Sequence, residues 1–164
     1  MKGIDVKPVY SVISLSFLII LLFVTPVICS TDDWVEYGRS YDDNVYFYNS
    51  VRIKPTTKDI VQVLTKKVYS DVGKQEYIEE RRKVDFRIEG YDKLSHTLDL
   101  YEIDCKKKMN NLLSISHYDM DNKILYHHSY DKPDWNYIIS SSMFDYLREI
   151  VCVTQKKPLK KKKK

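Results

Sequence analysis

The sequence predicts an α+β fold, in which an antiparallel β-sheet of about six to seven strands carries a packed C-terminal α-helix. Short runs rich in Val, Ile, Thr and Tyr recur along the chain, and turn-forming Asp, Asn, Gly and Pro residues separate them, as is typical of strands. The final patterned segment instead places apolar residues three and four positions apart, which indicates a helix. The 14 tyrosines also favour strands, because tyrosine has a high β-propensity.

Three short strands are predicted in the first half of the chain, over residues 34–38, 45–48 and 51–54, and a longer strand follows over residues 59–69. The Asp-Asp-Asn cluster after Tyr41 predicts a hairpin turn between the first two strands. Residues 74–87 contain strong helix formers with acidic residues ahead of basic ones, which indicates a short solvated helix or an excursion loop. Candidate docking residues in this segment are Arg81, Arg82 and Lys83. Neighbouring glutamates cancel much of their field, so a plain charged surface is the alternative.

The second half of the chain predicts the centre of the sheet. Apolar side chains fall on both faces of the alternating pattern in residues 97–105, which indicates a central strand that is covered on each side. Two further strands, over residues 109–118 and 124–128, are expected to pair antiparallel across a tight turn at residues 119–122.

A C-terminal helix is predicted to begin at Ser142, which can cap it, and Asp145 completes a capping-box pattern. One face of this helix is apolar through Met143, Tyr146, Leu147, Ile150 and Val151. Cys152 falls at the helix end. If the helix packs across the central strand, Cys152 comes within bonding range of Cys105.

Residues 1–30 predict a signal peptide, because two lysines precede an apolar run over residues 12–24 and small residues follow it. Cleavage is expected near Cys29 or Ser30. One alternative is an uncleaved anchor through residues 9–28, since the run approaches the ~20 residues that a spanning helix needs. Lipidation of Cys29 is a third alternative, which the large Ile28 before it disfavours.

The cysteine count supports export and a disulfide. Of the three cysteines, Cys29 lies in the predicted leader, and its removal leaves Cys105 and Cys152 as an even pair in an oxidising compartment. Two buried free thiols are the alternative. A metal site is disfavoured because the sequence has no CxxC pair.

Positive charge is concentrated at the C-terminus. The formal net charge is +4, but lysines of the tail supply most of the excess, and the body of the chain is net negative. This distribution argues against a nucleic-acid-binding face. We expect residues 155–164 to form a disordered, solubilising tail or to contact anionic lipids, at roughly 1 kcal/mol per lysine. The candidate lysines are Lys160, Lys161, Lys162, Lys163 and Lys164.

The sequence carries no recognisable catalytic motif. Glycine-rich phosphate loops, GxSxG and HExxH are all absent, so we expect no enzymatic activity, no cofactor and no metal. His117, His127 and His128 are expected to be surface residues or, in one case, a packed ring.

Several residues of the C-terminal half resemble the surface-adhesin protein E family. They are the run Tyr101–Lys106, Trp135, the serines 140–142 and the pair Val151-Cys152. The resemblance implies an antiparallel sheet with a disulfide-linked C-terminal helix. It also implies an envelope protein that binds host matrix and serum proteins such as vitronectin, laminin and plasminogen.

The leading functional hypothesis is therefore an exported, non-enzymatic protein of the periplasm or cell envelope that acts by binding another protein. The alternative is a membrane-anchored structural domain whose basic tail associates with anionic lipid or another polyanion. The sequence leaves the identity of the protein partner and the oligomeric state open.

Overall fold

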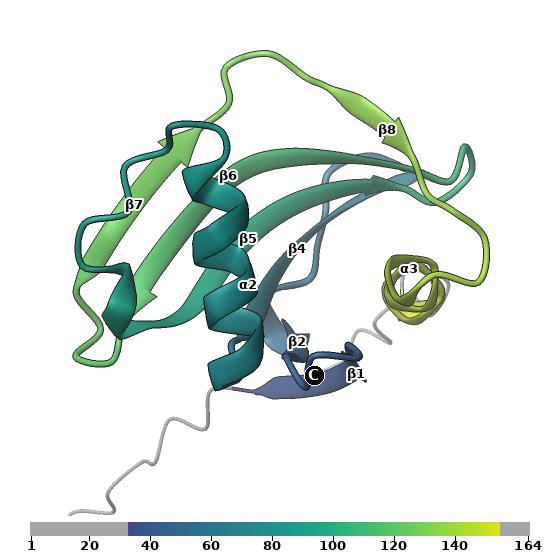
Figure 1. The fold of residues 1–164 in the computed structure, drawn as a ribbon. Helices are drawn as coiled ribbons and strands as arrows, with labels where there is room; N and C mark the ends of the chain where they lie inside the picture. Colours follow the sequence, from purple (N-terminus) through teal and green to yellow (C-terminus); the bar gives the residue numbers. More distant parts are fainter. Residues whose placement is uncertain (1–32, 155–164) are drawn as a thin grey trace, which may run out of the picture. The chain divides into compact units, whose positions relative to one another are not determined.

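A computed structural model describes residues 33–154 of the chain (Figure 1). The strands are β1 (Trp34–Arg39), β2 (Val45–Asn49), β3 (Lys54–Pro55), β4 (Ile60–Val68), β5 (Leu94–Asp104), β6 (Met109–Asp119), β7 (Ile124–Ser129) and β8 (Trp135–Tyr137). The helices are α2 (Asp71–Arg82) and α3 (Met143–Thr154), with short 3₁₀ turns η3 (Ser50–Arg52) and η4 (Tyr91–Lys93). Within the described residues, no helix is long and apolar enough to span a bilayer. The predicted leader and lysine tail lie outside these residues.

The strands form one antiparallel sheet, which confirms the predicted fold class. Its main path is β1-β2-β4-β5-β6-β7, while β3 pairs with β4 and β8 pairs with β6. The predicted central strand is β5, which lies between β4 and β6. The predicted hairpin between β6 and β7 is also present.

The prediction of a strand over residues 51–54 is wrong for most of that segment. Residues Ser50–Arg52 form η3, and only Lys54 and Pro55 pair with β4. The side chain of Asn49 accepts a hydrogen bond from the backbone N–H of Arg52 at 3.0 Å. This local bond stabilises a turn in place of an extended strand.

The segment around residue 74 is a helix rather than a loop. It begins at Asp71, earlier than predicted, because Ser70 caps it by accepting a hydrogen bond from the Gly73 N–H at 2.9 Å. Gly73 therefore lies in the first turn of α2.

Both helices lie on the same face of the sheet (Figure 1), so the prediction that β5 is covered on each side is wrong. On β5, Thr97 and Ile103 share a face because side chains alternate. Thr97 pairs with His117, whose ring contacts Tyr77 of α2. Ile103 belongs to the core that contains Leu147 of α3.

Two apolar cores fix the helices on that face. The α3 core joins Leu147 and Val151 to Val61, Val63 and Ile103, all of which are fully buried. The α2 core is smaller and more aromatic, and its buried members are Ile78, Tyr91 and Leu94. The helices are therefore anchored at different ends of the same sheet face.

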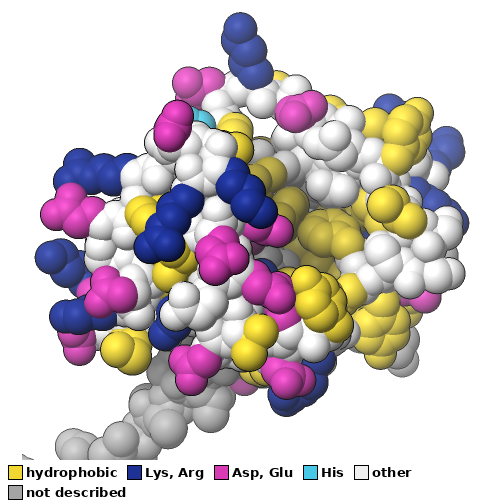
Figure 2. All heavy atoms as spheres, in the orientation of Figure 1, with side chains coloured by type: hydrophobic (Ala, Val, Ile, Leu, Met, Phe, Trp, Pro, Cys, Tyr) yellow, Lys and Arg dark blue, Asp and Glu magenta, His cyan; other side chains and the backbone are white. Residues whose placement is uncertain are grey.

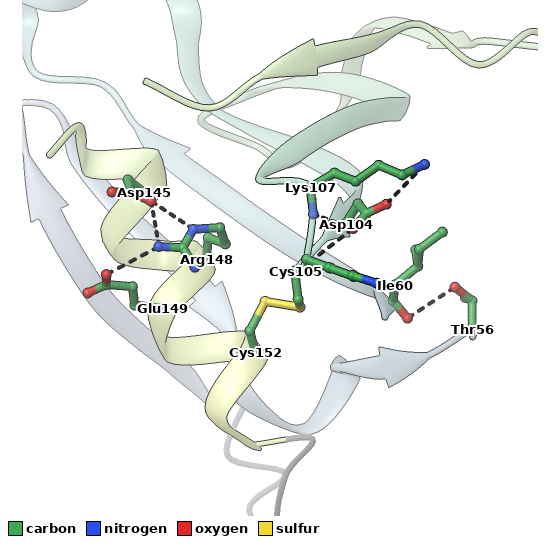
Figure 3. Close-up of a disulfide and its surroundings, with 10 residues drawn as sticks. Thr56, Ile60, Asp104, Cys105, Lys107, Asp145, Arg148, Glu149 and Cys152 are labelled. Atoms are coloured by element: carbon green, nitrogen blue, oxygen red, sulfur yellow. Dashed lines mark hydrogen bonds and ion pairs between the residues drawn. A yellow bond between two sulfur atoms is a disulfide. The ribbon is translucent and has the colours of Figure 1, made fainter. Parts of the chain in front are cut away.

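The predicted disulfide between Cys105 and Cys152 is confirmed, with a Cα–Cα distance of 5.8 Å (Figure 3). Asp104 holds the turn that carries Cys105, because its Oδ1 accepts hydrogen bonds from the N–H groups of Lys106 and Lys107 at 3.0 and 2.8 Å. The bridge thus joins the end of β5 to the last turns of α3.

The start of α3 departs slightly from the predicted capping box. Ser142 Oγ accepts a hydrogen bond from the Asp145 N–H at 3.1 Å, as expected. The Asp145 carboxylate, however, accepts from the Ser141 N–H at 3.1 Å rather than from Ser142. It also pairs with Arg148 at 2.7 Å (Figure 3), and the hydrogen bonds to Arg148 and Ser141 lower its pKa.

Candidate binding site

A cleft separates α2 from α3 on the covered face of the sheet. Figure 2 shows this hollow, with hydrophobic side chains on its floor. On this part of the sheet, ring contacts and electrostatic interactions bring together residues from β1, β2, β5 and the end of β4. We call this set the tyrosine cleft, and its members are Tyr37, Tyr46, Lys67, Tyr69, Asp99 and Tyr101.

Strand register explains why these side chains meet. Asp99 follows Thr97, which lies beside the α2 core, and precedes Tyr101, whose ring contacts Phe144 of α3 at a centroid distance of 4.9 Å. All three β5 side chains point to the same face. Asp99 therefore lies in the strip of sheet between the two helices, and neither helix pairs with its carboxylate.

Asp99 is the most unusual polar group of the cleft. Its Oδ1 atom is buried and has no hydrogen-bond partner among the described residues. Buried acceptors are almost always hydrogen-bonded, so an orphan carboxylate oxygen requires an explanation. Burial raises the pKa of Asp99 to about 7, and the nearby Lys67 ammonium opposes that rise. Near neutral pH Asp99 is therefore only partly ionised, and a positive partner placed beside it favours the carboxylate form.

The tyrosines supply neutral aromatic surfaces. Burial raises the pKa of Tyr37, Tyr69 and Tyr101 well above the usual range, and the charge of Asp99 adds to this effect. Their hydroxyls consequently stay protonated. Lys67 Nζ lies 4.5 Å from the ring centroid of Tyr69 and 5.6 Å from that of Tyr46, so the cleft already holds one cation against tyrosine faces.

Acidic side chains surround one edge of the cleft. A pocket of about 190 Å³ opens where Tyr46, Lys67 and Tyr77 meet the turn between β1 and β2. Its wall includes Asp42, Glu76 and Glu80. The hydroxyl of Tyr41 donates a hydrogen bond to Glu76 Oε2 at 3.0 Å. This edge carries a negative field that favours cationic ligands.

His117 is the packed ring that the sequence led us to expect among the histidines. It is 1% exposed, and the Tyr91 and Tyr77 hydroxyls lie 2.6 and 3.3 Å from Nδ1 and Nε2. Burial, with a contribution from Arg81, lowers the pKa of His117 to about 4. His127 points to the other face, where it contacts two serine hydroxyls. Among residues 33–154, no cluster of three His, Cys, Asp or Glu side chains is suited to a metal ion.

The candidate docking residues do not form one patch. The guanidinium of Arg81 lies 4.9 Å from the ring centroid of Tyr77 and 5.2 Å from that of Phe86, so it packs onto the α2 core. Arg82 and Lys83 are exposed. Docking through these residues stays a prediction, as does lipid contact through Lys160–Lys164, which lie outside the described residues.

Sequence reasoning missed the tyrosine cleft. One signal was present: Asp99 is a charged residue at an inward position of a strand whose neighbours on that face become buried. The tyrosines around it come from segments far apart in the chain, so no local motif reveals them.

These features define a class of protein: a small, disulfide-stabilised α+β domain with an aromatic cleft suited to binding. The family model for surface-adhesin protein E matches residues 34–153, and the chain belongs to this family. Membership supports an adhesin-like protein of the cell surface.

Two solved structures are similar to the chain. One is crystal form II of Haemophilus influenzae protein E, with 11% identity, coverage of 82% of this chain and 98% of that chain, and a TM-score of 0.46. Another structure of Haemophilus influenzae protein E has 10% identity, coverage of 75% and 86%, and a TM-score of 0.44. Comparison with curated protein sequences finds no match.

Proposed function

We propose that this chain is an exported, non-enzymatic, adhesin-like protein that acts at the periplasm or cell surface by binding another protein. The family match over residues 34–153 carries the proposal. The Cys105–Cys152 disulfide agrees with it, because such bonds persist in oxidising compartments outside the cytosol. Host matrix and serum proteins are the proposed partners.

The proposal includes a three-part chain. Residues 1–30 are the signal peptide, residues 31–154 the binding domain, and residues 155–164 a lysine-rich tail. The basis is the apolar run over residues 12–24 and the cluster of C-terminal lysines. The intact mass of the protein from cells is expected to correspond to a start near Ser30 or Thr31.

Adhesion is tested by binding the full exported chain to immobilised vitronectin, laminin and plasminogen, with albumin as the control surface. We expect saturable binding at micromolar concentration to at least one of the three. A chain from which Lys156–Lys164 are deleted serves as the matched control, since a folded binding domain retains this binding without the tail. Absence of saturable binding to every one of these proteins contradicts the adhesion proposal.

The second candidate function is a membrane-anchored structural domain, which the length of the apolar run favours. In that case residues 9–28 are retained, and the intact mass includes Met1. The lysine tail then binds anionic vesicles in a salt-dependent way, and its deletion abolishes that binding.

A further inference from the structure

The tyrosine cleft combines an unpartnered carboxylate with neutral aromatic faces. We propose that it binds an arginine side chain of a protein partner, with the guanidinium placed between Asp99 and the tyrosine rings. This inference deepens the proposed function and rests on it, since it names the chemistry by which a protein partner is recognised.

The charge of the cleft selects a cation. Asp99 Oδ1 is buried without a hydrogen-bond partner, which is costly unless a donor from outside completes the site. The acidic residues Asp42, Glu76 and Glu80 surround the adjoining pocket. Lys67 is the one basic residue among those that line this pocket, and two tyrosine rings already hold its ammonium.

Lys67 does not complete the site. Among the described residues, Lys67 and Asp99 form no ion pair within 4.0 Å, although Lys67 is close enough to affect the pKa of Asp99. The ammonium lies over Tyr69 at 4.5 Å instead. The chain therefore shows that these tyrosines attract a cation, and it leaves the carboxylate oxygen for another donor.

Arginine fits this arrangement better than lysine. Its planar guanidinium stacks on aromatic faces and donates two parallel hydrogen bonds to one carboxylate. It is also more weakly hydrated than an ammonium, which lowers the cost of entering a half-buried cleft. The tyrosine hydroxyls remain protonated, and they offer acceptor lone pairs for the remaining N–H groups.

The test uses a short probe peptide, acetyl-Gly-Arg-Gly-amide, titrated into the full exported and oxidised chain while backbone amides are observed by NMR. The control probe replaces arginine with citrulline, which has the same shape and no charge. We expect shifts of residues in β4 and β5 that line the cleft, with the arginine peptide alone.

Two variants with opposite expected effects on the affinity for the arginine peptide extend the test. Asp99→Asn is expected to weaken binding of the arginine peptide by about tenfold or more, because a charge-assisted hydrogen bond is lost. Lys67→Met is expected to tighten binding by about threefold, because a competing positive charge is removed. A variant that merely misfolds cannot tighten binding.

Matched controls come from η4. Asp92→Asn and Lys93→Met make the same charge changes at exposed positions outside the cleft, and both are expected to leave the affinity unchanged. Equal binding of the citrulline peptide, or an unchanged affinity in Asp99→Asn, overturns the inference. If matrix proteins still bind Asp99→Asn as tightly as the unaltered chain, the inference fails while the proposed function stands.

Discussion

At the scale of single residues, Asp99 and His117 have opposite pKa shifts on the same sheet face. Burial raises the pKa of Asp99 to about 7 from its ordinary value of 3.8 and lowers that of His117 to about 4 from 6.5. Both groups thus prefer to be neutral in the folded state. Their effects on stability run in opposite directions across the same pH range.

The signs follow from proton linkage. Folded Asp99 binds a proton more readily than the unfolded chain does, so its contribution is fully present below pH 3.8 and is lost as pH rises through about 7. Folded His117 resists protonation, so its contribution is full above pH 6.5 and is lost as pH falls towards about 4. Between pH 4 and 6.5 the pH dependences of these two contributions, each a few kcal/mol at most, therefore oppose each other in the unaltered protein.

Substituting each residue alone is expected to reveal the pH dependence that the other one gives to the free energy of unfolding. In Asp99→Asn, the free energy of unfolding falls as pH drops from 6.5 to 4, because only the His117 effect remains. In His117→Gln, it rises over the same interval, because His117 no longer opposes the effect of Asp99. Urea unfolding at several pH values measures both slopes. Parallel pH profiles for the two variants contradict this account.

At the scale of elements, α2 is docked by the turn between β1 and β2. Asn44 is fully buried, and its side chain accepts a hydrogen bond from the Ser70 N–H at 3.0 Å and donates one to Asp42. Gly73 packs directly against the Asn44 amide, so a Cβ at this position overlaps Asn44 atoms. The start of α2 therefore depends on one close approach.

Two glycine variants test this dependence as a matched pair. Gly73→Ala is expected to lower the free energy of unfolding by about 1–3 kcal/mol, because the buried Asn44 amide has nowhere to move. Gly38→Ala is expected to cost less than about 1 kcal/mol, because its Cβ meets Sδ and Cγ of Met143, an unbranched side chain that can adopt another rotamer. Thermal and urea unfolding give both values. A Gly73→Ala protein as stable as Gly38→Ala contradicts the proposed docking.

At the scale of the whole described domain, the disulfide and the α3 core act on the same helix. Cys105 and Cys152 are separated by 47 positions, so the bridge closes a long loop that includes β6, β7 and β8. In the chain-entropy model a loop of this length contributes about 4 kcal/mol. This is a large share of the stability of a small domain.

The double variant Cys105→Ser, Cys152→Ser is therefore expected to lose about 4 kcal/mol of unfolding free energy. The buried contacts of Leu147 and Val151 with the sheet keep α3 in place under native conditions. Urea unfolding compares the variant with the oxidised protein.

In the unreduced protein, unfolded in denaturant, neither Cys105 nor Cys152 is expected to react with a thiol reagent, and reaction of either one refutes the bridge.

The sequence by itself determined the antiparallel sheet, the C-terminal helix and the cysteine pair. These depend on local alternation, on the three- and four-residue spacing of α3, and on a count of cysteines, all of which the chain order carries. It could not predict η3, because one Asn49 side-chain bond competes there with strand pairing.

Only the tertiary structure decided which face of the sheet the two helices cover. Alternation shows that both sides of β5 carry apolar groups, but the placement of α2 and α3 on one side depends on which distant side chains bury together. The tyrosine cleft exists for the same reason, since Tyr37, Tyr46, Tyr69 and Tyr101 meet Asp99 only when β1, β2, β4 and β5 come into register. A binding surface made of single residues from several strands leaves no local pattern in the sequence.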